Sequence, residues 1–182
     1  SVDVLVRAKR SMEAYRAMLV FARHATDPRT RSDAVRREAG DRLGRLAHKD
    51  ELLDAVVEQA CGDKGLASVQ ASQVLIAIGS TAAARLVRSL ENRKDASRAR
   101  VTQLLIALGD AAIAQVVDEL GSAQPERARR AARLLGEMQN PKGVCFLADA
   151  LAGPDPSLAR EAALALARIG DDAALQALIR GL

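Results

Sequence analysis

The sequence predicts an all-α fold in which a pair of helices is repeated along the chain. Its apolar residues are mostly Ala and Leu, whereas Phe and Tyr total three and Trp is absent. This composition favours helices over the β-branched and aromatic surfaces of sheets. The segment LIAIGSTAAARLVRSL, which begins at Leu75, recurs thirty residues later as LIALGDAAIAQVVDEL. Such a recurrence indicates stacked helical units.

Residues 1–30 do not share the repeat and are predicted to form one N-terminal helix that ends near Thr26, Asp27 and Pro28. We expect this helix to cover the first repeat, either as a cap or as the remnant of a degenerate repeat. Its apolar residues follow one another at intervals of three or four, which places them on one helix face: Val4, Ala8, Met12, Tyr15, Leu19 and Ala22.

Residues 31–182 form the predicted repeat array, with units at approximately 31–64, 65–94, 95–124, 125–154 and 155–182. The second helix of each unit has apolar residues at positions i, i+3, i+4 and i+7, which we call the stripe; its first members are Leu53, Ala83, Ile113, Val144 and Leu175. Each first helix has an apolar pair: Leu43 and Leu46, Leu75 and Ile78, Leu105 and Leu108, Leu135 and Met138, or Leu166 and Ile169. Because a two-helix unit cannot bury both apolar faces alone, stacking into an α-solenoid follows.

Glycine and proline mark the predicted turns. Gly79, Gly109 and Gly170 follow the first helix of their units, where a residue with positive φ ends a helix, and Gln139 stands near this place in another unit. The segments SAQPER and AGPDPS lie between units, and their prolines are expected to interrupt the helices there.

Two segments carry a family resemblance: EAALALARIGDDAALQALIRGL, from Glu161 to Leu182, and ARRAARLLGEMQNPKGVCFLADAL, from Ala128 to Leu151. They resemble HEAT-like repeats, especially the short repeats also seen in phycobilisome lyases, and the resemblance extends roughly from Asp33 to Leu182. It implies a right-handed α-solenoid of about five HEAT-like helical pairs with an N-terminal capping helix. It is specific for the fold and says little about function.

The stripe of the last unit reaches Leu182 without a polar cap after it. Stacked repeats normally finish with a polar outer face. Either further repeats follow in a longer chain, which we prefer, or another molecule covers this face.

The composition excludes several classes of protein. No apolar run approaches the roughly 18 to 20 residues of a membrane span, and the N-terminus lacks the apolar segment of a signal peptide. We therefore expect a cytoplasmic protein without a membrane partner. Cys61 and Cys145 lie outside any C-x-x-C spacing and are expected to stay unlinked.

No catalytic, cofactor or metal site is predicted. Some HEAT-like proteins bind a metal for hydroxylation through His-Glu pairs, but here His24 precedes Ala25 and His48 precedes Lys49. The sequence also lacks a Gly-rich phosphate loop and a Ser with a His and an acid at readable spacing. We expect a non-enzymatic protein without a cofactor.

Nucleic acid is the alternative partner, because the net charge is +4 and some HEAT-like proteins grip a duplex. Aligned units place four arginines at one position, where they can follow a phosphate backbone: Arg36, Arg98, Arg129 and Arg160. The structural interpretation is preferred, since an acid stands three residues before three of them and within reach of an ion pair: Asp33, Asp95 and Glu126.

The preferred function is a protein-interaction scaffold or regulatory module that binds a peptide or protein on its concave face. The second helices normally line that face, and their positions outside the stripe alternate in charge, so Glu58, Arg88 and Asp118 can pair from unit to unit. Such a surface suits a partner with mixed charges and apolar anchors. Phe146 is expected to be at least partly exposed. The predicted partner-binding residues are Arg85, Arg88, Gln115, Asp118, Phe146 and Asp149.

Overall fold

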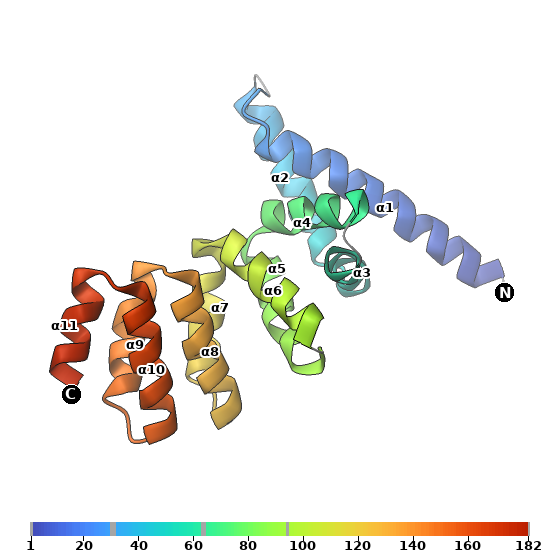
Figure 1. Ribbon diagram of the computed structural model, residues 1–182. Helices are drawn as coiled ribbons and strands as arrows, with labels where there is room; N and C mark the ends of the chain where they lie inside the picture. Colours follow the sequence, from blue (N-terminus) through green and yellow to red (C-terminus); the bar gives the residue numbers. More distant parts are fainter. Residues whose placement is uncertain (1, 30–31, 63–64, 94, 182) are drawn as a thin grey trace. The chain divides into compact units, whose positions relative to one another are not determined.

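The computed structural model describes residues 2–29, 32–62, 65–93 and 95–181 (Figure 1). These residues contain α-helices and two short 3-10 helices and no strand, which confirms the predicted all-α class. The N-terminal helix α1 (Val2–Thr26) precedes five helical pairs. The pairs are α2 (Asp33–Ala47) with α3 (Asp50–Cys61), α4 (Leu66–Ile78) with α5 (Ser80–Ser89), α6 (Asp95–Leu108) with α7 (Asp110–Leu120), α8 (Pro125–Met138) with α9 (Val144–Leu151), and α10 (Pro156–Ile169) with α11 (Asp172–Gly181).

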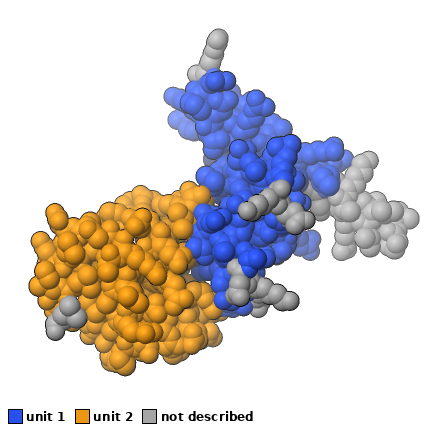
Figure 2. Space-filling model, viewed as in Figure 1, with its two compact units in different colours: residues 1–104 blue, residues 105–182 orange. Residues whose placement is uncertain are grey.

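The chain divides into two compact units, residues 1–104 and 105–182 (Figure 2), and the boundary falls within α6. The 3-10 helix Leu90–Asn92 follows α5 in the first unit, and the 3-10 helix Pro141–Gly143 precedes α9 in the second.

In the first unit, α1 packs against α2, α3 and α4. Ala22 is buried on this face and Tyr15 is half-buried, in line with the expected apolar face. Met12 is a correction, because more than half of its surface is exposed, whereas Met18, outside the expected face, is fully buried. With 3.6 residues per turn, Met12 lies at one edge of the expected row and Met18 lies beyond its other edge, next to Ala22, so the buried face is rotated from the one that the row predicted. The side chains of Val4 and Ala8 lie outside the described residues.

The stripes of the second helices form much of the core, as predicted. All four members of the stripe are buried in α3, and so are the four of the next unit, which extend from α5 to the first residue of the following 3-10 helix: Leu53, Val56, Val57 and Ala60, and Ala83, Leu86, Val87 and Leu90. The stripe of α11 is different, because Ile179 is 77% exposed and Leu175 is about half exposed, while Leu182 lies outside the described residues. The same sequence pattern thus leads to burial only where a neighbouring helix covers it.

In the second unit, α10 packs against α8, α9 and α11, and α9 packs against α11. The largest fully buried side chains here come from each layer of this stack: Leu105, Leu135, Leu147 and Leu166. The backbones of α8 and α10 lie close together at Gly136, where an added Cβ would lie 2.7 Å from the Cα of Ala165 in α10. Glycine at this position therefore permits the packing of α8 on α10.

The turns after the first helices contain the residues that the sequence predicted there. Gly79, Gly109 and Gly170 have φ values of 75°, 54° and 67°, and Gln139 adopts the left-handed conformation with φ of 49°. The prolines lie at the boundaries between units, as predicted: Pro154 is in the turn after α9, and Pro125 and Pro156 are the first residues of α8 and α10. The first turn of a helix tolerates proline, since its N–H has no partner there.

Among the described residues, no helix is both long enough and apolar enough to cross a membrane. Cys61 is half-buried and Cys145 is exposed, and both are free thiols that lie in different units.

Candidate functional site

The unit of residues 1–104 contains a groove of about 660 Å³ between α3, α5 and the beginning of α6. It is lined by both acidic and basic side chains, and we call it the mixed-charge groove. Its lining residues are Asp54, Glu58, Arg85, Arg88, Ser89, Arg93 and Ser97. Two of the six predicted partner-binding residues, Arg85 and Arg88, therefore lie in one groove.

Helix periodicity positions these side chains. The stripe of α3 is buried, so Asp54 and Glu58, which follow Leu53 and Val57, remain on the water-facing side. On α5 the stripe is also buried, and Arg88 is exposed next to it. Burial of the apolar stripes therefore turns the charged residues of two successive repeats toward the same groove.

Arg85 forms an ion pair with the preceding repeat. Its Nε and Nη2 donate hydrogen bonds to the two carboxylate oxygens of Asp54, and its Nη1 lies 3.6 Å from Oδ1 of Asp50. The hydrogen bond from Arg85 lowers the pKa of Asp54, and the same bond raises the pKa of Arg85. This guanidinium is thus fixed within the groove, and only about a quarter of the side chain is exposed.

A second inter-repeat pair joins Glu58 to Arg93. The Nη2 of Arg93 donates to Oε1 of Glu58, and its Nη1 lies 3.4 Å from Oε2. The Nε of Arg93 donates to the hydroxyl of Ser89 at 3.3 Å. Glu58 therefore pairs with Arg93, and the expected pairing with Arg88 is wrong, because the long side chain of Arg93 reaches back across the groove from the turn after α5.

Arg88 is the open cation of the groove. It is exposed, and among the described residues it has neither an ion pair nor a hydrogen bond. The carboxylates beside it also remain accessible, since the side chains of Asp54 and Glu58 are 53% and 71% exposed. The groove thus presents a free positive charge next to two negative charges that are held in position.

The other four predicted residues lie in the unit of residues 105–182. Asp118 and Asp149 are exposed, and Phe146 is 38% exposed, next to the exposed Cys145. Gln115 differs from its neighbours, because its side chain is half-buried and its Oε1 is buried without a hydrogen-bond partner in the described part of the chain. Gln115 is therefore less open to a partner than its place outside the stripe suggests.

The aligned arginines have local partners. Arg36 pairs with Asp33 and Arg129 pairs with Glu126, as the spacing of three predicts. Arg98 donates from Nη2 to the backbone oxygen of Arg93 at 3.1 Å, and the side chain of its expected partner Asp95 lies outside the described side chains.

Arg160 is the most open of these arginines. Its side chain is largely exposed, and its Nη2 lies 3.7 Å from Oε1 of Glu161. The four side chains therefore differ in both exposure and pairing.

Asp54 and Arg93 are site residues that the sequence analysis missed. Asp54 stands 31 residues before Arg85, which is one repeat, so a search for opposite charges one repeat apart would find this pair. Arg93 stands 35 residues after Glu58 and gives no such signal. Within the described residues, no group of three or more His, Cys, Asp or Glu side chains is arranged to hold a metal ion.

The chain is similar to several solved structures. Human deoxyhypusine hydroxylase, solved in complex with glycerol, is 22% identical over 93% of this chain and 71% of its own, with a TM-score of 0.44. An engineered protein is 22% identical over 90% of this chain and 51% of its own, with a TM-score of 0.39. Another engineered protein is 19% identical over 88% of this chain and 84% of its own, also with a TM-score of 0.39.

No curated protein matches the sequence at a significant level. A family model described as HEAT repeats matches residues 113–182. This segment includes most of α7 and all of the two pairs that follow it, α8 with α9 and α10 with α11. The resemblance to HEAT repeats noted in the sequence is therefore confirmed over residues 113–182.

Proposed function

We propose that the protein is a non-enzymatic interaction module whose mixed-charge groove binds a peptide or protein segment that carries both acidic and basic side chains. The observation that carries this proposal is the open guanidinium of Arg88 beside the accessible carboxylates of Asp54 and Glu58. HEAT repeats typically mediate protein–protein interaction, which supports a binding role for a chain that contains them.

The geometry suits a partner segment with two charges. A partner carboxylate pairs with Arg88, and a partner Lys or Arg pairs with the exposed edges of Asp54 and Glu58. Arg85 and Arg93 already hold these two carboxylates in position. Binding of a partner therefore immobilises few further side chains of the groove, which keeps its entropy cost low. Each exposed ion pair contributes about 0.2 to 1 kcal/mol, so the affinity depends on several contacts and falls with salt.

Phe146 and Asp149 are proposed as a second contact region, in the unit of residues 105–182. A partly exposed aromatic ring with charged neighbours is a common type of interface anchor. Asp118 of α7 is included as an exposed charge, whereas Gln115 contributes least because its amide oxygen is buried.

Backbone-directed binding of nucleic acid through Arg36, Arg98, Arg129 and Arg160 is the alternative function. The exposure of Arg160 favours it. The ion pairs of Arg36 and Arg129 within their own helices oppose it, because a phosphate has to displace a carboxylate that is already bound.

The test is selection of peptides from a displayed random library on the full chain, followed by affinity measurement with charge-reversed variants. We expect the selected peptides to carry both charges and to lose affinity for Arg88→Glu by about tenfold, which corresponds to about 1.4 kcal/mol. Arg180→Glu changes an exposed arginine on α11 and serves as the matched control. Selected peptides that bind Arg88→Glu as tightly as the parent protein would rule out the mixed-charge groove.

A further inference from the structure

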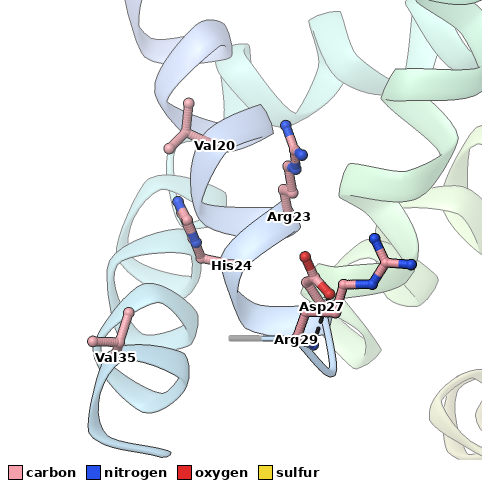
Figure 3. Close-up of a pocket in the computed structure, with 6 residues that line it drawn as sticks. All are labelled: Val20, Arg23, His24, Asp27, Arg29 and Val35. Carbon is pink, nitrogen blue, oxygen red and sulfur yellow. Dashed lines mark hydrogen bonds between the residues drawn. The ribbon is translucent and has the colours of Figure 1, made fainter. Parts of the chain in front are cut away.

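A second groove runs between α1 and α2 in the unit of residues 1–104. Its larger hollow has a volume of about 580 Å³ and is lined by Val20, Arg23, His24, Asp27, Arg29 and Val35 (Figure 3). An adjoining hollow of about 390 Å³ shares His24 and Val35 with it. We call the two hollows together the α1–α2 groove; it shares no lining residue with the mixed-charge groove.

One wall of the α1–α2 groove is apolar and open to water. Val20 of α1 is 53% exposed and Val35 of α2 is 48% exposed, and Figure 3 shows them on the same side of α1 with His24 between them. Phe21 and Ala34 line the adjoining hollow. A large apolar side chain placed over the two valines would remove apolar surface from water, at roughly 25 cal/mol per Å².

Two arginines of this groove are exposed and lack an ion pair within the described residues. Arg23 and Arg29 are exposed, and the guanidinium of neither has an ion pair or hydrogen bond within the described part of the chain. Asp27 stands between them, but its Oδ1 accepts the backbone N–H of Arg29 at 2.8 Å and holds the turn after α1 (Figure 3). The larger hollow is therefore lined by two arginines and by a single carboxylate that already has a hydrogen-bonding role.

The carboxylate of the adjoining hollow is also engaged. The Nε of Arg42 donates to Oε1 of Glu38 at 2.6 Å, and this hydrogen bond lowers the pKa of Glu38. The guanidinium of Arg42 also lies 5.8 Å from the centre of the Phe21 ring, within the range of a cation–π contact. Within the described part of the chain, the charged side chains of the α1–α2 groove that have no partner are thus positive.

We propose that the α1–α2 groove binds an acidic peptide that places one large apolar side chain over Val20 and Val35 and its carboxylates beside Arg23 and Arg29. Charge complementarity selects this occupant, because a basic segment would meet two unpaired guanidinium groups. A nucleic-acid backbone supplies negative charge but no apolar group for the two valines. The acidic peptide meets both requirements.

The probe for this proposal is a fluorescein-labelled peptide of Asp and Glu residues with a central Leu-Phe pair, titrated with the full chain by fluorescence anisotropy. One matched peptide has Ser in place of the Leu-Phe pair, and another has Lys in place of every acid. We expect the parent peptide alone to bind. The double variant Arg23→Glu, Arg29→Glu weakens binding by about tenfold or more, and Val35→Thr, which keeps the shape but adds a hydroxyl, weakens it severalfold.

Arg16→Glu is the matched control, because it reverses an exposed arginine of α1 that does not line either hollow. Thermal melting of each variant checks that the fold is intact, and the changed side chains are all exposed. The proposal is overturned if the double variant binds as tightly as the parent protein, or if the Ser peptide binds equally well. It is also overturned if the acidic peptide does not bind, whether or not phosphatidylserine vesicles or duplex DNA bind through Arg23 and Arg29.

Discussion

Glu161 of α10 accepts hydrogen bonds from Arg133 of α8, which precedes it by 28 residues. The Nη2 of Arg133 lies 3.1 Å from Oε1 of Glu161, and its Nε lies 3.4 Å from Oε2. Glu161 is only 7% exposed, so its carboxylate is a buried charge between two repeats. Arg160 approaches Oε1 at 3.7 Å but is largely exposed. The pair therefore connects two successive repeats through one buried carboxylate.

Arg133→Ala is expected to lower the free energy of unfolding by about 1 to 2 kcal/mol. A fully buried charge that loses its partner costs more, but Arg133 is more than half exposed and water can enter its place. Urea denaturation measures the change, and Arg160→Ala, which removes the exposed neighbour, is expected to cost less than about 0.5 kcal/mol. Equal losses in the two variants would contradict the primary role of Arg133.

Acid is expected to weaken this contact. The hydrogen bond from Arg133 holds the pKa of Glu161 below its ordinary value of 4.5. The unfolded chain therefore takes up the proton at higher pH than the folded chain, so the contribution of Glu161 is fully present above pH 4.5. It is lost as the pH falls from there through the folded pKa.

Unfolding free energies measured between neutral pH and pH values below 4.5 test this expectation. Glu161→Gln removes the titrating group and is expected to lose less stability over this range than the parent protein. Asp54, Glu38 and Asp110 also have lowered pKa values and titrate in both proteins. Identical pH profiles for the two proteins would show that Glu161 does not contribute.

Gly136→Ala is expected to destabilise the second unit. The new Cβ would lie 2.7 Å from the Cα and 2.8 Å from the Cβ of Ala165, so α8 and α10 have to move apart. Overpacking of this kind costs about 1 to 3 kcal/mol, whereas alanine gains about 1 kcal/mol in helix propensity over glycine. The net change is therefore expected to lie between about zero and a loss of about 2 kcal/mol.

Gly44→Ala is the matched control, because Gly44 lies within α2 and a Cβ there meets nothing within 4 Å. This variant is expected to gain up to about 1 kcal/mol. The two substitutions should therefore shift the melting temperature in opposite directions, or at least differ by more than the propensity gain. Equal stabilisation in both would mean that α8 and α10 are not as close as described.

The fold was predictable because its signals are local and recur in every unit. The stripe residues Val56, Leu86 and Val116 are buried at nearly equal intervals along the chain. The unit without a turn glycine was also predicted, since Gln139 stands near the place of that glycine and also has a positive φ. Apolar period and turn chemistry depend on neighbours within a few residues, which a single sequence displays.

The candidate site was predictable only in part. The period placed Arg85 and Arg88 outside the stripe, but it did not indicate that Arg85 is bound to Asp54 while Arg88 is open. Arg100 shows the reason, because it reaches the backbone oxygen of Ala60, 40 residues away, at 3.3 Å. An arginine side chain can select among several partners in adjacent helices, and sequence spacing does not distinguish between them.

Arg129→Ala tests the alternative nucleic-acid function. If Arg129 serves mainly its pair with Glu126, the variant loses about 0.2 to 1 kcal/mol of stability, since Glu126 is well exposed. Its affinity for a labelled DNA duplex, measured by anisotropy at low and moderate salt, stays the same. Salt-sensitive binding that Arg98→Ala and Arg129→Ala reduce step by step would instead favour a phosphate-binding role, with a loss of about one in the salt slope for each arginine.

Phe146 is 38% exposed, although the adjacent Leu147 is fully buried. Phe146→Ala is expected to lower the free energy of unfolding by less than about 2 kcal/mol, since part of the ring is already in water. Leu147→Ala, one position away on the same helix, is expected to cost about 2 to 5 kcal/mol. Thermal melting of both variants measures this difference, and because both residues lie in α9, the helix is the same in the two measurements.

The same two variants separate packing from binding. For peptides selected on the full chain, an exposed anchor predicts that Phe146→Ala weakens binding by about tenfold while the fold remains stable. Leu147→Ala should affect binding only as far as it unfolds the chain, because its side chain has no surface for a partner to contact. If Phe146→Ala destabilises the protein as much as Leu147→Ala and leaves the affinity unchanged, the ring belongs to the core and the second contact region has to be abandoned.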